Sequence, residues 1–300
     1  MRIERHQLPV SVVSAVRAEF EDRLSTQIRI MRTHAAGSRE WRETAEVFLD
    51  YLGALSAGTP ALDTPEARTI LRNAALAAGG AVKCAAYAGY ERFSVGIDYV
   101  NFGTIHELDE NETASPVDPA AWTEAFCLVI LAGQVDEFGE SFDFTRTVGD
   151  DAAGDPSAEL ARGLLSQASG YIVDDRTASH PPSVQEQLAA LDAALTRIRT
   201  RRATGGDRLP GHPHTVALQA LRATVAGDRE AFDSRLAALL LQHSATPGPG
   251  SRTSTLLALL PLALAALAYR AQSWTPGVES DYLPHSLVTG PEGSGRPLPR

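Results

Sequence analysis

The chain has 300 residues, of which 44% are hydrophobic and 21% are charged, so it can form one or two folded domains and is not a disordered polypeptide. Its two cysteines, Cys84 and Cys127, are too few for a disulfide scaffold or a four-cysteine zinc site, and they fit a reducing cytoplasm. The net charge of −10 excludes the basic excess that a general DNA-binding or RNA-binding protein needs, so we expect no direct contact with nucleic acid.

We expect a soluble cytoplasmic protein without a membrane partner. The N-terminal sequence MRIERHQLPV lacks the continuous apolar segment of a secretory signal. The most apolar run, residues 256–269, has fourteen residues and contains Pro261, whereas a membrane-spanning helix needs about 20 apolar residues. This run predicts a buried core helix that starts at Ser254 or Thr255.

Three amphipathic helices are predicted in the first third of the chain. Apolar residues recur at helical spacing over residues 10–33. Ser38 is expected to cap the second helix. The Thr-Pro-Glu sequence at 64–66 combines a hydroxyl cap, a proline for the first turn and an acidic side chain, and it predicts the start of the third helix.

Further helix starts are predicted at Asp118 and Asp155, each followed by proline, and at Ser183, which opens a Ser-Val-Gln-Glu capping box. Gly227–Asp228 is expected to end one helix and to cap the next. The leucine and aromatic spacing on these helices predicts which side chains are largely buried. They are Trp41, Phe48, Leu52, Phe126, Leu131, Leu191, Leu236 and Leu260.

These patterns predict an all-α (mainly α) protein of about eight to ten helices, arranged as a multi-helical bundle or a helical-hairpin array. Residues 214–269 resemble a helix hairpin with small residues at the crossing, so the C-terminal end could be tetratricopeptide-like. Residues 92–105 are β-branched and aromatic with rough alternation, which predicts a short strand or hairpin.

The Gly-rich and Pro-rich residues 203–213 predict a loop that could divide the chain. An N-terminal helical region, residues 1–202, would then contain the acidic middle segment. A C-terminal helical subdomain, residues 203–290, would pack on it, and residues 291–300 would form a mobile tail. A single domain over residues 1–290 is the alternative.

No catalytic motif is found in the sequence: it contains no nucleophile elbow, no phosphate-binding glycine-rich loop and no HExxH helix. His106–Asp109 and the pair His212 and His214 carry metal-ligating side chains, but a solvated acidic loop and a helix-leading loop are the preferred explanations. Cys84 and Cys127 lie in apolar runs and are expected to be unreactive core residues. We therefore predict no catalytic residue, no cofactor and no metal site.

Charge is strongly segregated along the chain. Residues 98–175 contain seventeen acidic residues and two arginines, a net charge of −15. A surface of this charge attracts basic proteins, although a solubilising surface with several aspartate helix caps is an equal alternative. Within the segment, Glu107, Asp109, Glu110 and Glu112 are closely spaced in a predicted loop without nearby basic residues. They are the first candidates for partner binding.

Five segments resemble the immunity protein 49 family of bacterial polymorphic toxin systems, in the same order and almost from end to end. They are FLDYLGALSAGTPALDTPEARTILRNAA (48–75), FSVGIDYVNFG (93–103), WTEAFCLVIL (122–131), LLPLALAALAYR (259–270) and DYLPHSLVTG (281–290). The resemblance implies a mainly α-helical cytosolic protein that is not an enzyme and that binds and neutralises a cognate toxin made by the same cell. It transfers no catalytic residue and no toxin-contact residue.

The class of toxin is left open by the sequence. Nuclease clefts are basic because they hold phosphates, so an acidic surface could cover one, and a basic nuclease domain is a toxin that fits. Two rival functions remain. One is a helical-repeat scaffold that binds another cellular protein, and the other is a metal-dependent hydrolase that uses acidic and histidine residues of the middle segment.

Overall fold

The computed structural model describes residues 1–34, 36–87, 89–107, 117–146, 153–170, 179–205, 211–246 and 250–290. In these ranges the chain forms eleven α-helices, a short 3-10 helix and one two-stranded sheet. In chain order they are α1 (Val10–Thr33), α2 (Ser38–Gly58), α3 (Pro65–Tyr87), β1 (Phe93–Ile97), β2 (Phe102–His106), α4 (Pro119–Ala132), α5 (Val135–Arg146), α6 (Pro156–Ser169), α7 (Val184–Gly205), α8 (Pro213–Ala226), α9 (Arg229–Ala245), η2 (Thr253–Leu256), α10 (Leu259–Gln272) and α11 (His285–Thr289). The mainly α prediction is confirmed, and the five-residue α11 takes the number of helices above the expected range.

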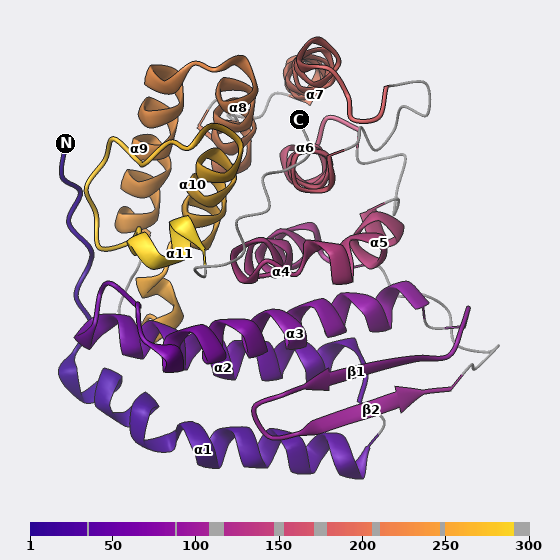
Figure 1. The fold of residues 1–300 in the computed structure, drawn as a ribbon, viewed down its shortest axis with the longest axis vertical. Helices are drawn as coiled ribbons and strands as arrows, with labels where there is room; N and C mark the ends of the chain where they lie inside the picture. Colours follow the sequence, from indigo (N-terminus) through magenta and orange to yellow (C-terminus); the bar gives the residue numbers. More distant parts are fainter. Residues whose placement is uncertain are drawn as a thin grey trace.

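The helices pack in stacked groups (Figure 1). Helices α1, α2 and α3 lie side by side, and the β-hairpin packs against α3. Helices α4 and α5 rest on the other side of α3 and connect this group to α6. Helices α8, α9 and α10 run across the direction of α1–α3. Helix α10 packs against α4 and so connects this group to the rest of the structure. The hydrophobic core is therefore continuous from α1 to α11.

Most predicted helix starts are confirmed by their caps. The Thr64 hydroxyl accepts a hydrogen bond from the N–H of Ala67 at 3.1 Å, and the Asp118 and Asp155 carboxylates each accept two from the first turns of α4 and α6. The Ser38 prediction is wrong, because Ser38 is the first residue of α2. Its neighbour Gly37 lies at the cap position and donates its N–H to the Glu40 carboxylate at 2.9 Å.

The capping box at Ser183 is also confirmed: the N–H of Ser183 donates to Glu186, and the Ser183 hydroxyl accepts from the N–H of Glu186. The carboxylate of Asp228 accepts a hydrogen bond from the N–H of Ala231 after Gly227 has ended α8 in the left-handed conformation. Short-range chemistry therefore sets where these helices begin and end.

The predicted β element is an antiparallel hairpin in which Phe93 pairs with His106 and Ile97 pairs with Phe102. Phe93, Val95 and Ile97 alternate with more exposed residues and point into the core. A Cβ on Gly80 would lie 2.1 Å from a methyl group of Val95, so the small residues of α3 allow the hairpin to pack closely.

Seven of the eight predicted core residues are at most 7% exposed, and Leu260 is only partly buried. The Leu260 prediction is wrong: Leu260 lies in the first turn of the last long helix, which begins at Leu259 rather than at Ser254 or Thr255. Residues 253–256 form the 3-10 helix η2 instead. Pro261 then falls in the first turn of α10, where its missing N–H costs no helical hydrogen bond.

One stretch of the described residues, Thr253–Gln272, is long and apolar enough to cross a membrane by length and composition. In this structure 61% of its most apolar 18-residue window is buried inside the protein, and α10 packs against α4, α8, α9 and α11. The apolar sequence is thus used in the core, as expected for the 256–269 run.

The expected division of the chain at residues 202–203 falls within the last turns of α7. Helices α8 and α9 form the predicted helix hairpin and pack against each other and against α10. Both the division into subdomains and a tetratricopeptide-like array remain predictions. The expected mobile tail, residues 291–300, lies outside the described part of the chain.

Candidate functional site

Glu107, the first of the predicted partner-binding residues, directly follows β2 at the open end of the hairpin. Its side chain is 72% exposed and forms an ion pair with Arg92 at 3.2 Å. The expectation that it lacks a basic neighbour is therefore wrong, because the antiparallel register brings the residue before β1 beside the residue after β2. Asp109, Glu110 and Glu112 lie outside the described residues.

A line of aromatic rings leads from the open end of the hairpin to the surface. The His106 ring stacks on Phe93 at 4.6 Å, and Phe93 contacts Tyr87, the last residue of α3. Tyr87 contacts Phe144 of α5, whose ring meets that of Tyr90 edge to face at 5.4 Å. The ends of α3, α5 and the hairpin meet on one side of the molecule (Figure 1), and these rings connect them.

The outer two rings of this line are largely in solvent, since Tyr90 is 62% exposed and Phe144 is 46% exposed. Tyr90 is held in the turn after α3: Gly89 adopts a φ of 77°, and the N–H of Tyr90 donates to the Tyr87 carbonyl at 3.0 Å. Rigid aromatic side chains lose little conformational freedom when they are covered by a partner.

The outer face of α5 beside these rings is acidic. Asp136, Glu137 and Glu140 are exposed, and none of them forms an ion pair within the described part of the chain. Asp136, Glu140 and Phe144 are spaced four residues apart and therefore share one stripe of the helix. We call this surface, made of Asp136, Glu137, Glu140, Phe144 and Tyr90, the α5 face.

The histidines that were considered as metal ligands form hydrogen-bond contacts with neighbouring residues of the protein. His106 is within 3.1 Å of the Thr104 hydroxyl and 3.6 Å of the Cys84 sulfur. At the start of α8, His212 accepts a hydrogen bond from the N–H of His214, and His214 is 2.8 Å from the Ser157 hydroxyl. Among the described residues, no three His, Cys, Asp or Glu side chains lie close enough together to hold a metal ion.

Both cysteines are buried, as predicted. Burial raises the pKa of the Cys127 thiol far above its ordinary value, and the charge of Glu124 adds to the increase. Cys127 is therefore a neutral core side chain at physiological pH and is not prepared to act as a nucleophile.

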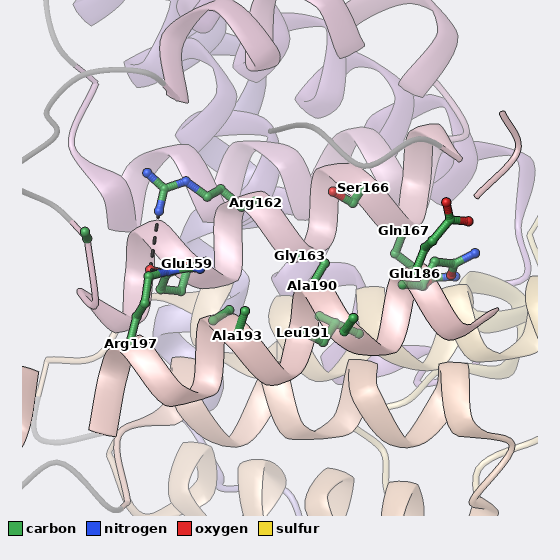
Figure 2. A pocket seen from close by; sticks show the side chains of 14 residues that line it. Glu159, Arg162, Gly163, Ser166, Gln167, Glu186, Ala190, Leu191, Ala193 and Arg197 are labelled. Carbon is green, nitrogen blue, oxygen red and sulfur yellow. Dashed lines mark hydrogen bonds and ion pairs between the residues drawn. The ribbon is translucent and has the colours of Figure 1, made fainter. Parts of the chain in front are cut away.

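A groove of about 580 Å³ lies between α6 and α7 (Figure 2). The small residues Gly163, Ala190 and Ala193 line its middle, and polar side chains that include Gln167 lie at one end. A Cβ on Gly163 would lie 2.8 Å from a terminal methyl group of Leu218 on α8, so a larger residue here would force that side chain to shift. The small side chains therefore account for the shape of the groove.

The other end of the groove contains the fully buried carboxylate of Glu159. Arg197 donates hydrogen bonds to both of its oxygens, at 2.8 and 2.7 Å, and the N–H of Gly154 donates at 2.9 Å. Burial raises the pKa of Glu159, but these hydrogen bonds outweigh it, so the pKa lies below its ordinary value. Glu159 is thus a charged group that holds the start of α6 to α7, and it is not poised for proton transfer.

Sequence reasoning located the acidic segment but missed the α5 face. The four-residue spacing of Asp136, Glu140 and Phe144 was visible and could have indicated a helix stripe with an aromatic end. The approach of Tyr90 to Phe144 could not be predicted, because it depends on how α3 and α5 pack.

Comparison with known protein families identifies a family to which the chain belongs. The family model described as Immunity protein 49 matches residues 60–287, which is most of the chain. The match begins before α3 and ends in α11, so it includes the hairpin, the α5 face and the groove. No curated protein and no solved structure matches the chain.

Proposed function

Because the chain belongs to the immunity protein 49 family, we propose that it binds a cognate bacterial toxin and neutralises it by stoichiometric protein–protein inhibition. The family match over residues 60–287 is the observation that carries this proposal. An inhibitor of this kind needs a stable scaffold and a complementary surface rather than reaction chemistry. The proposed place of action is the cytoplasm, where the toxin would meet its target in the producing cell.

The charge of the chain supports a basic toxin. The acidic segment 98–175 includes the exposed carboxylates of α5 and Glu107. A negative surface increases the rate at which a basic protein associates. A basic nuclease domain is the class of toxin that we propose, since its phosphate-binding cleft would be covered by such a surface.

The proposal is tested with the protein encoded beside the gene for this chain, which we expect to be the cognate toxin. Cells that express the toxin should grow when they also express this chain, and they should not be rescued by an immunity protein of another family. The two purified proteins should form a complex of one copy each. No protection together with no binding would contradict the proposal.

Glu107, Asp109, Glu110 and Glu112 remain our proposed toxin contacts from the sequence. Single exposed charges contribute little, so all four should be changed to Lys together. We expect slower association and weaker salt dependence with an unchanged far-UV spectrum. A fourfold variant that associates at the wild-type rate and protects fully would show that these four residues are not the contacts.

A further inference from the structure

The two exposed rings of the α5 face are fixed before a partner arrives. Tyr90 is held by the turn at Gly89, and Phe144 lies on the last turn of α5 with its ring against Tyr87. Two large aromatic side chains in contact at 62% and 46% exposure form an apolar patch at the surface. Patches of this kind, surrounded by polar groups, are typical of protein-binding sites, and tyrosine is enriched at their energetic centres.

The surroundings of the rings indicate the charge of the partner. Asp136, Glu137 and Glu140 extend from Phe144 along α5, and none of them is neutralised by an ion pair in the described ranges. Glu107, which follows His106 at the other end of the line of rings, is paired with Arg92. A partner surface rich in Arg and Lys would complement the carboxylates, and its cationic groups would also be attracted to the ring faces.

We propose that the α5 face is the surface that receives the toxin, with Tyr90 and Phe144 as its aromatic anchors and the α5 carboxylates as contacts for a basic surface of the toxin. This inference rests on the proposed function and names the surface and the partner chemistry for it. It moves the centre of recognition from the loop after β2 to the junction of α3 and α5.

The test measures binding of the full chain to the inactivated toxin encoded by the adjoining gene, at two salt concentrations. A Tyr90→Ala/Phe144→Ala variant should raise Kd about thirtyfold or more, as expected for hot-spot residues. An Asp136→Lys/Glu137→Lys/Glu140→Lys variant should slow association and reduce the salt dependence of Kd. These three carboxylates are exposed, so the second variant remains informative if the aromatic variant is poorly folded.

Two matched controls lie on other faces. Glu19→Lys/Asp22→Lys/Glu279→Lys changes the net charge by the same amount at exposed positions, and Ile30→Ala removes a side chain that is 40% exposed on α1. Both should bind within about threefold of wild type. Wild-type affinity in the two α5-face variants would overturn the inference while leaving the proposed function intact. Failure of the wild-type chain to bind the toxin would overturn both.

Discussion

Gly53 shows how the absence of one side chain lets two distant segments meet. A Cβ at this position in α2 would lie 2.0 Å from the carbonyl oxygen of Thr253 in η2. The same junction is held by the Thr253 hydroxyl, which donates to the Asp50 carbonyl at 2.6 Å, and by the ion pair of Arg252 with Asp50 at 2.9 Å. The backbone of η2 therefore cannot move away without breaking these contacts.

We expect Gly53→Ala to lower the free energy of unfolding by about 1–3 kcal/mol, the usual cost of overpacking a core. Gly58→Ala, at the end of the same helix, is the matched control. Its Cβ would have only an ordinary contact, 3.6 Å from Arg17, so this change should be neutral or slightly stabilising. Urea unfolding of both variants measures the difference, and equal stabilities would contradict the close packing at Gly53.

Leu236 tests the assigned core face of α9. It is fully buried, whereas Leu241 on the same helix is 52% exposed. Leu236→Ala should lower the free energy of unfolding by about 2–5 kcal/mol, because it leaves a cavity, and Leu241→Ala should change it by less than about 0.5 kcal/mol. The assignment fails if the two variants have the same unfolding midpoint.

At the scale of single elements, sequence reasoning succeeded where the determining chemistry is local. The caps at Thr64, Asp118, Asp155 and Ser183 involve side chains within three residues of the groups they satisfy, so the sequence displays both partners. The start of α10 was missed because residues 253–256 contact α2, and a contact with a distant helix leaves no local signal. Tertiary packing overrode the local pattern there.

The contact between the starts of α6 and α8 makes stability depend on pH. Burial, together with a smaller effect of the neighbouring His212, lowers the pKa of His214 to about 4. The neutral ring is favoured in the folded state, so the unfolded chain takes up the proton first as the pH falls below about 6.5. The folded state therefore has its full stability, as far as His214 is concerned, above about pH 6.5, and part of that stability is lost between about pH 6.5 and pH 4.

Partial exposure of the His214 ring limits the loss to about 1–2 kcal/mol. Burial also lowers the pKa values of His6 and His243. The stability of the folded protein should therefore fall for these two residues as well when the pH is lowered. Unfolding of wild type and His214→Gln should therefore be measured at pH 7 and pH 5. Wild type should lose more stability than the variant, and an equal loss would contradict a neutral, partly buried His214.

At the scale of the whole molecule, the two ends of the described chain are joined. Arg2 pairs with Glu279 in an isolated β-bridge, and His6 contacts Tyr282 and lies 3.1 Å from the Thr255 hydroxyl. Helix α5 packs against both α3 and α6, and all three helices contribute to the continuous core. A rigid scaffold of this kind suits an inhibitor that must present a preformed surface.

The candidate site was only partly predictable from the sequence, because some of its contacts join segments that are distant in the chain. The excess of acidic residues is a property of composition, so the sequence identified the region that contains Glu107 and α5. The pairing of Glu107 with Arg92 depends on strand register, and the contact of Tyr90 with Phe144 depends on the packing of two helices. Neither arrangement is encoded by the spacing of neighbouring residues.

The most direct test of the central claim is a titration of toxin activity with the wild-type chain. If the chain is a stoichiometric inhibitor, activity should fall linearly and reach zero at one molecule of chain per molecule of toxin. The toxin recovered after dissociation should be fully active and unchanged in mass. Complete inactivation by far less than one equivalent, or a covalent change in the recovered toxin, would contradict the account and show that the chain acts as an enzyme.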